Sequence, residues 1–379
     1  MTTGSHALNT IIRHEIDQHG GLISFARFME LALYHPEFGY YNAEKFDIGK
    51  QGDFTTASEI SPLFAQCLAR QCQQIMTQLD TADILELGAG TGRFAGELLL
   101  ELDKLKSLPK HYYIYEISHR LRDKQKTLLQ SRYPSICDRI SWIENLPTGF
   151  HGVMIANEVL DALPVNCFRI HHQRVEERCV TWENKQFSWK LSNPTSSELQ
   201  YKVEQLQKNY DFDDGYESEI SLDLPTFIQT LTDALNKGVI LVSDYGYGQQ
   251  EYYRPERSMG TLTCFYQHTH HDNPLIQPGF QDITAHVDFT SVIEAAASHG
   301  CALAGYTTQA AFLLDCGLMN LVEEQEKNLS PADKVNMHHA VKVLTMPAEM
   351  GERIKVMALA KNIELQLRGF HLQDRRREL

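Results

Sequence analysis

The sequence lacks a long hydrophobic run and a leader-like start. No apolar stretch in its 379 residues approaches the ~20 residues that a membrane-crossing helix needs. The opening segment, MTTGSHALNTIIRHEIDQHGG, carries acidic residues and no apolar core, which fits neither a secretory signal nor a transit peptide. The eight cysteines form no C-x-x-C pair, as expected for reduced thiols in a cytoplasm. We therefore expect a cytoplasmic protein without a membrane span.

Positive charge is also scarce. The chain has 35 Lys and Arg residues against 49 Asp and Glu residues, for a net charge of −14 at pH 7. Broad nucleic-acid binding needs a basic face, so this class is excluded. The basic cluster Arg375–Arg377 lies in the terminal tail between acidic residues and predicts a solvated end. An acidic chain suits a basic protein partner, although solubility alone explains most of the charge.

An apolar run that ends in a glycine-rich turn is the most informative segment. Residues 84–92 read ILELGAGTG, and the helix-like stretch RFAGELLL follows. Glycines let the backbone turn sharply and let a ligand approach closely, and the start of a helix adds free N–H groups. Strand, turn and helix in this order predict a cofactor site rather than an ordinary turn.

The glycine spacing favours one cofactor class over another. Dinucleotide-binding proteins use G-x-G-x-x-G, with the pyrophosphate at the helix N-terminus. Here the pattern is G-x-G-x-G, Arg93 takes the place of the third glycine, and Glu86 stands two residues before Gly88. A carboxylate there would repel a pyrophosphate but suits the ammonium and sulfonium of S-adenosylmethionine. That cofactor is therefore favoured, and a NAD-dependent oxidoreductase is the alternative.

Strands and helices alternate through the middle of the chain, which predicts an α/β fold with a mainly parallel, Rossmann-like sheet of seven strands. The strands are expected at 83–87, 111–116, 139–143, 152–156, 239–246, 301–307 and 353–360. A long loop is expected from the fifth strand to about residue 287. The predicted organisation is a helical N-terminal segment with a cofactor-covering loop at 1–80, a core at 81–164 and 238–365, a β/α insertion on the substrate side at 165–237, and a tail at 366–379.

An ordered set of short motifs runs from about residue 35 to 360. It comprises His35-Pro36, Gly39-Tyr40-Tyr41, Gly52-Asp53-Phe54-Thr55-Thr56, the glycine turn, Tyr115-Glu116-Ile117-Ser118, Asn157-Glu158-Val159-Leu160-Asp161-Ala162-Leu163-Pro164, Asp244-Tyr245-Gly246, Gly260-Thr261-Leu262, the segment 282–289, Thr308-Gln309 and Glu349-Met350-Gly351. Together these motifs resemble the MidA-like family of class I S-adenosylmethionine-dependent methyltransferases, relatives of the mitochondrial complex I assembly protein arginine methyltransferase. The chain departs from the family at Ala89, Leu160 and 352–356.

The resemblance implies a set of cofactor-binding residues. Glu86 and the turn glycines would hold the amino-acid part of S-adenosylmethionine, and the Glu116 carboxylate would accept the ribose hydroxyls. Glu116 could instead be a favourable acid at a helix N-terminus. The full set is Gly52, Asp53, Thr56, Glu86, Gly88, Gly90, Gly92, Glu116 and Asn157. A turn that only anchors the loop is the alternative for 52–56.

The resemblance also implies substrate-facing residues. Methyl transfer from a sulfonium mainly requires an aligned nucleophile and the exclusion of water. Paired carboxylates can hold an arginine guanidinium bidentately and direct one nitrogen to the methyl group. The expected catalytic residues are Glu158, Asp161 and His286, and the expected substrate-binding residues are Phe54, Tyr245 and Asp288. Alternatively, Asp161 only caps its loop and Tyr245 only packs.

No metal site is expected. His268, His270 and His271 crowd one loop, but H-x-H-H matches no strong zinc spacing. Asp211, Asp213 and Gly215 lack the later ligands of a calcium loop.

The implied function is methylation of arginine on a protein partner, for which a respiratory-complex subunit is one candidate. Methylation of another substrate and a non-catalytic assembly factor are the alternatives. The oligomeric state stays open, with a homodimer as one option.

Overall fold

A central sheet organises the chain, whose computed structural model describes residues 3–43, 56–79, 81–266 and 269–379. The strand order is β14-β15-β9-β4-β1-β2-β3, and the short β13 pairs with β9. All neighbours from β3 to β9 are parallel, whereas β15 runs antiparallel to both of its neighbours. The strands are β1 (Asp83–Leu87), β2 (Tyr112–Tyr115), β3 (Ile140–Ile143), β4 (Phe150–Asn157), β9 (Leu235–Tyr247), β13 (Val287–Asp288), β14 (Ala302–Thr308) and β15 (Ile354–Lys361). The predicted Rossmann-like α/β fold with seven main strands is confirmed.

Alternating side chains of the strands bury both faces of this sheet. In β4, Val153 and Ile155 pack with helices on one face, and Met154 and Ala156 pack with helices on the other. This is the two-residue period of a strand buried on both sides. The first face is covered by α4 (Pro62–Thr77), α5 (Arg93–Lys104), α6 (His119–Arg132), α11 (Gln309–Asp315), α12 (Leu318–Glu326) and α13 (Pro331–Thr345), and the second by α8 (Leu224–Ala234) and α10 (Phe289–Ser298).

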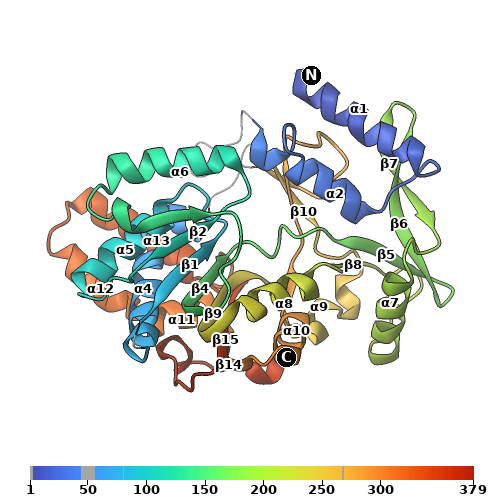
Figure 1. Cartoon of the computed structure of the whole chain (residues 1–379). Coiled ribbons are helices and arrows are strands. Elements are labelled where there is room, and N and C mark those ends of the chain that lie inside the picture. The colour runs from blue at the N-terminus through green and yellow to red at the C-terminus, as the bar shows by residue number, and fades with distance from the viewer. Residues whose placement is uncertain (1–2, 44–55, 80, 267–268) are drawn as a thin grey trace.

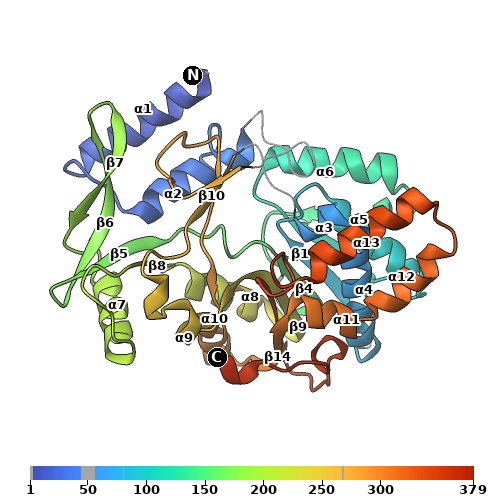
Figure 2. The same ribbon diagram turned by 180° about the vertical axis from the view of Figure 1, so that it is seen from behind.

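The insertion forms a second sheet beside the N-terminal helices (Figures 1 and 2). Its strands are β5 (Asn166–His171), β6 (Arg174–Glu183), β7 (Gln186–Ser192) and β8 (Glu217–Ile220), in the order β7-β6-β5-β8, and α7 (Ser197–Asn209) accompanies them. Helices α1 (Thr3–Gln18) and α2 (Phe25–Tyr34) share a hydrophobic cluster with this sheet, and Ile23 bridges to Val180. The N-terminal segment and the insertion therefore pack together.

The long loop expected before residue 287 is wrong in part. Within the described residues it contains a three-stranded antiparallel sheet of β10 (Thr263–Tyr266), β11 (Thr269–His271) and β12 (Asp282–Thr284). Cys264 and Ile283 from this sheet join the cluster of α1 and α2. Tertiary packing thus stabilises strands too short to be recognised by their local pattern.

The remaining elements are short. They are α3 (Ala57–Ile60), α9 (Gln249–Tyr252) and the 3-10 turns Tyr40–Asn42, Cys137–Arg139, Pro255–Arg257, Arg368–Phe370 and Arg376–Glu378. The C-terminal tail is not simply a solvated end: the Arg375 N–H donates to the Tyr306 carbonyl at 2.8 Å, and its guanidinium pairs with Glu352 at 3.0 Å. Among the helices of the described segments, none has the length and apolar character to span a bilayer.

Candidate active site

The glycine turn follows β1 at the carboxyl edge of the central sheet. Gly88, Gly90 and Gly92 all have positive φ, at 62°, 53° and 87°. Residues with a side chain adopt this left-handed region at a cost, so the three glycines are explained by the backbone they must form. The turn lies where the strand order reverses between β1 and β4, the place at which open α/β sheets bind ligands.

A cavity of about 420 Å³ opens at this edge. Its lining comes from the turn, the ends of β1, β2 and β4, the start of α3, and residues of α2 and α8. The polar and charged lining residues are Glu30, Tyr34, Tyr41, Thr56, Ser58, Glu59, Glu86, Thr91, Tyr115, Glu116, Asn157, Glu158 and Asp223. The volume and the mainly apolar walls with a few converging polar groups are those of a small-molecule site.

Two buried carboxylates line the cavity at the ends of β1 and β2. The Tyr112 hydroxyl donates to Glu86 at 2.8 Å, and burial raises the pKa of Glu86 to about 8. Glu116 accepts the Ser118 N–H at 3.0 Å and the Gln125 amide at 3.1 Å, and burial raises its pKa as well. Glu116 therefore accepts a backbone N–H at the start of α6 and also lines the cavity.

Gln125 connects Glu116 with the glycine turn. Its amide nitrogen also donates to the Gly90 carbonyl at 3.0 Å, and Trp142 donates to its side-chain oxygen at 2.8 Å. Gln125 is fully buried, so this network holds the Glu116 carboxylate in one orientation. The sequence interpretation missed Gln125 and Trp142, because neither belongs to a recognisable motif.

Arg93, which takes the place of a third glycine, connects the glycine turn with α3. Its guanidinium donates to the Glu59 carbonyl at 2.8 Å, and the Thr91 hydroxyl donates to the Glu59 carboxylate at 2.5 Å. These contacts join α3 to the turn. Thr56 lines the cavity and its hydroxyl is bonded to that of Ser58 at 2.8 Å. The predicted residues Gly52, Asp53 and Phe54 lie outside the described residues.

Asn157 and Glu158 line the cavity from the end of β4. Glu158 accepts the Ala57 N–H at 3.1 Å and the Asn157 amide at 3.2 Å. Burial raises the pKa of Glu158 to about 8. The nearby Asp244 raises this pKa further, and the two hydrogen bonds lower it. The Asn157 side-chain oxygen is buried and has no partner among the described residues, so it is available to a donor of a bound ligand.

Further carboxylates lie behind Glu158. Asp161 is buried, and its pKa is raised well above the usual range by burial and by Asp244, Glu158 and Asp282. No basic side chain in the described parts of the chain forms an ion pair with Glu158, Asp161 or Asp244. Burial and mutual repulsion favour the protonated forms of these carboxyls, and a cationic ligand would favour their ionised forms.

The structure places other predicted residues off the cavity lining. Asp161 lies behind it and Gly92 is the N-cap of α5. Tyr245 stacks on His286 with 6.2 Å between ring centroids, and burial beside Glu158 raises the pKa of Tyr245. His286 and Asp288 line a second cavity of only about 30 Å³. There burial and Arg257 lower the pKa of His286 to about 3, so its ring is neutral at pH 7.

The Asp288 side chain caps the start of a helix. It is the N-cap of α10, where it accepts the Thr290 N–H at 3.0 Å, the Ser291 N–H at 3.3 Å and the Ser291 hydroxyl at 2.7 Å. A side chain with these bonds satisfies the free amides of a helix start. Its predicted contact with the substrate stays a prediction.

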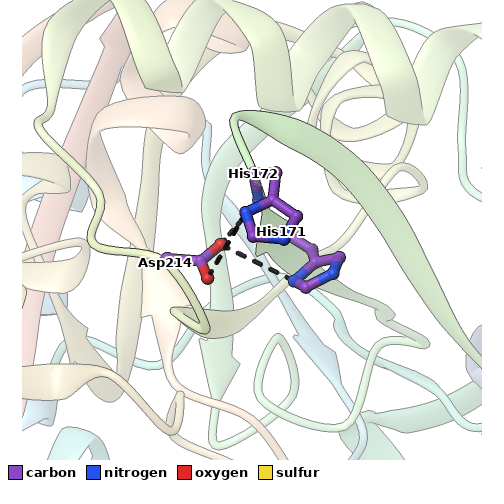
Figure 3. A group of neighbouring side chains, drawn as sticks. All are labelled: His171, His172 and Asp214. Atoms are coloured by element: carbon purple, nitrogen blue, oxygen red, sulfur yellow. Dashed lines mark hydrogen bonds and ion pairs between the residues drawn. The ribbon is translucent and has the colours of Figure 1, made fainter.

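His171, His172 and Asp214 form a separate group on the insertion (Figure 3). One ligand atom from each lies within 4.8 Å of the others, and the side chains are largely exposed. Asp214, in the segment before β8, already accepts the His172 N–H at 2.6 Å, which joins the turn between β5 and β6 to that segment. The group lies outside the lining of the large cavity.

Comparisons with known proteins show the family of this chain. Residues 67–307 match the family described as "Putative S-adenosyl-L-methionine-dependent methyltransferase". The fold matches a crystal structure of a Burkholderia thailandensis protein bound to S-adenosyl-homocysteine, with a TM-score of 0.94, 37% identity, and coverage of 99% of this chain and 97% of that one. A native crystal structure from the same organism matches with a TM-score of 0.91, 36% identity and the same coverage.

Curated relatives match over most of the chain. Protein arginine methyltransferase NDUFAF7, mitochondrial, from Homo sapiens is 29% identical, over 91% of this chain and 82% of its own length. The Danio rerio protein of the same name is 26% identical, over 92% of this chain and 86% of its own length. The expected cytoplasmic location is contradicted, because these relatives are named as mitochondrial proteins. With its fold, its glycine turn and its matched region, the chain belongs to this family of S-adenosylmethionine-dependent methyltransferases.

Proposed function

We propose that this chain transfers the methyl group of S-adenosylmethionine to a guanidinium nitrogen of arginine in a protein partner. The observation that carries the proposal is the Glu158 carboxylate on the cavity lining, with Asp161 and Asp244 behind it and no cation paired with any of them among the described residues. The names of the curated relatives support the same substrate class.

The residues of the cofactor half fit S-adenosylmethionine. Its ammonium suits the acidic end of β1 at Glu86, its ribose suits Glu116, and the Asn157 oxygen offers an unpaired acceptor. The glycine turn leaves the cavity wall free of side chains at Gly88 and Gly90. When bound, this cofactor supplies an electrophilic methyl group on a sulfonium. The contribution of the protein is then to place the acceptor nitrogen in line with it.

The substrate half fits an arginine side chain. Tyr34, Leu163 and Phe227 provide apolar walls for the aliphatic stem, and Glu158 stands where a guanidinium can be held. Arginine does not lose its proton readily before reaction, since its pKa exceeds ~12. A carboxylate with a raised pKa is a suitable acceptor for the proton that the nitrogen releases during methylation. We assign this role to Glu158, with Asp161 buried behind it.

The mouth of the cavity is acidic as well. Glu30 of α2 and Asp223 at the start of α8 both belong to the lining, and burial, Glu30 and Glu198 raise the pKa of Asp223. This charge suits a basic segment of a protein partner. A respiratory-complex subunit is our candidate partner, supported by the resemblance of the motifs to the complex I assembly methyltransferase. A homodimer stays a further expectation.

The function is tested by incubating the chain with S-adenosylmethionine carrying a labelled methyl group and with extracts or purified respiratory-complex subunits. Mass spectrometry should find the label on arginine of a protein. Label on another amino acid or only on a small molecule would refute the arginine assignment and leave the methyltransferase class intact. A chain that binds the cofactor and transfers nothing to any acceptor would favour the non-catalytic assembly factor.

The ribose role of Glu116 leads to a prediction about cofactor affinity. The Glu116→Gln chain should bind S-adenosyl-homocysteine about 10- to 100-fold more weakly, because charged hydrogen bonds to two hydroxyls become neutral ones. Isothermal titration calorimetry gives the dissociation constant directly. Glu144→Gln is the control, since Glu144 is an exposed carboxylate that pairs with Arg122 outside the cavity. Equal affinities of the two variants would argue against the ribose role.

A further inference from the structure

One carboxylate oxygen of Asp244 holds the loop that follows β4. This Oδ2 atom accepts three successive backbone N–H groups, from Val159 at 3.1 Å, Leu160 at 2.8 Å and Asp161 at 3.3 Å. The other oxygen, Oδ1, accepts the Tyr245 N–H at 2.9 Å. The Asp244 side chain is fully buried, with 0% of its surface exposed. The end of β9 therefore determines the backbone path of a loop that is remote in the sequence.

Glu158 begins this loop in an unfavourable backbone conformation. Its φ is +51°, in the left-handed region that costs a residue with a side chain free energy. The Glu158 N–H donates to the Ser243 carbonyl at 2.8 Å, next to Asp244 on β9. Such a conformation persists only where surrounding contacts hold it, and here these contacts come from two consecutive residues of the neighbouring strand.

We infer that Asp244 is a positioning residue: its carboxylate fixes the loop 158–161 and thereby directs the Glu158 carboxylate into the cavity. This assignment rests on the proposed function, in which Glu158 holds the guanidinium. Asp244 itself does not line the cavity, whereas Glu158 does. It therefore acts through the loop rather than on the substrate.

The arrangement requires a carboxylate rather than a neutral side chain of the same shape. Both oxygens of Asp244 accept backbone N–H groups, and an asparagine would have to turn its NH₂ toward one of the two sets. A donor facing a donor loses the hydrogen bond and leaves a buried amide unsatisfied. An aspartate occupies this position although burial raises its pKa to about 7. The four backbone N–H bonds to its carboxylate lower the pKa and oppose this effect. Repulsion from Asp244 in turn contributes to the raised pKa of Glu158 and of Asp161.

The test compares Asp244→Asn with a matched variant, Asp315→Asn, in the full chain. Oδ2 of Asp315 likewise accepts two successive N–H groups, from His371 at 2.8 Å and Leu372 at 2.6 Å, but it lies on α11 outside the cavity lining. Amide hydrogen exchange, S-adenosyl-homocysteine affinity, and kcat and KM for arginine methylation are measured for both variants, well below their unfolding temperatures.

Asp244→Asn should speed the exchange of the amides of 159–161 by about tenfold or more, because their acceptor is lost. It should lower kcat on the order of 10- to 100-fold, because the carboxylate that aligns the substrate is displaced. S-adenosyl-homocysteine affinity should change by less than about twofold in this variant, because Asp244 does not line the cavity. Asp315→Asn should leave all of these values unchanged. If Asp244 were merely structural, Asp244→Asn would lower the stability of the chain, as the loss of the Asp315 bonds would, without this selective loss of kcat.

Unchanged kcat or unchanged exchange in a folded Asp244→Asn chain would overturn the assignment. If that variant does not fold, exchange in the unaltered chain decides: amides of 159–161 should be as protected as those of β4, although they lie in a loop, and fast exchange would refute the clamp. If the unaltered chain methylates no arginine, the proposed function fails. In that case the exchange comparison still decides whether Asp244 holds the loop.

Discussion

Replacing Glu158 by glutamine should lower kcat/KM for arginine methylation on the order of 100-fold or more, because a buried guanidinium loses its charged partner. Glutamine keeps the side-chain oxygen that accepts the Ala57 and Asn157 N–H groups, so the loop and the cofactor half should be preserved. S-adenosyl-homocysteine affinity should therefore change by less than about twofold. Activity is measured with the labelled cofactor at saturation. Glu144→Gln, outside the cavity, is the control for the same substitution.

The pH profile separates loss of this carboxylate from indirect damage. Because the pKa of Glu158 is raised to about 8, the carboxyl is mostly protonated below that pH and must lose its proton to pair with a cation. In the unaltered chain, kcat/KM should therefore fall as the pH drops below about 8, approaching about tenfold per pH unit. The pKa of Glu86 is also raised to about 8. The cofactor is therefore supplied at saturation, so that titration of Glu86 does not reduce cofactor binding. Glu158→Gln should remove the part of this dependence between about pH 8 and the pKa of Asp244, which is about 7, and an unaltered profile in the variant would contradict the assignment.

Replacing Gly152 by alanine should cost about 3–5 kcal/mol of unfolding free energy, enough to abolish the fold in a marginally stable chain. Gly152 lies in the middle of the sheet, paired with Asp83 of β1 and with Gly238 of β9. Its φ is +145°, and an added Cβ would lie 1.9 Å from the Asp83 carbonyl oxygen. The neighbouring atom is backbone in a central strand and cannot move aside. Chemical denaturation followed by circular dichroism measures the loss.

Gly300→Ala is the control for backbone strain without collision. Gly300 has a φ of +82° and open space around the position of an added Cβ. Its replacement should cost only about 1–2 kcal/mol, the price of a left-handed residue with a side chain. Equal losses in the two variants would show that close strand approach at Gly152 contributes nothing.

The cofactor unit was predictable because its determinants are local. The predicted strand 83–87 coincides with β1, and the glycines at 88, 90 and 92 all adopt the positive φ that only glycine tolerates freely. The end of β4, with Asn157 and Glu158, lies at the carboxyl edge of the sheet and lines the cavity, as predicted, because parallel strands present their carboxyl ends together. Period-two burial and turn chemistry are legible in a single sequence.

The rest of the cavity was less predictable because its determinants are remote. Tyr34 of α2 and Phe227 of α8 meet at one cavity, yet neither stands in a motif. The strands β10–β12 are stabilised by their packing against the N-terminal helices rather than by their own pattern, so the sequence predicts a loop there. His286 and Asp288 follow a family motif, but the fold places them on a second, smaller cavity.

The sequence by itself determined the α/β sheet, the glycine turn, the class of cofactor and the acidic residues at the strand ends, because each depends on backbone conformation or charge within a few neighbouring positions. Only the tertiary structure decided which acids line the cavity. Glu158 lines the cavity, Asp161 lies behind it, and Asp244 holds their loop from another strand. These three carboxylates have similar chemistry in the sequence. Their roles differ because burial, hydrogen-bond partners and orientation are set by contacts between segments that are distant along the chain.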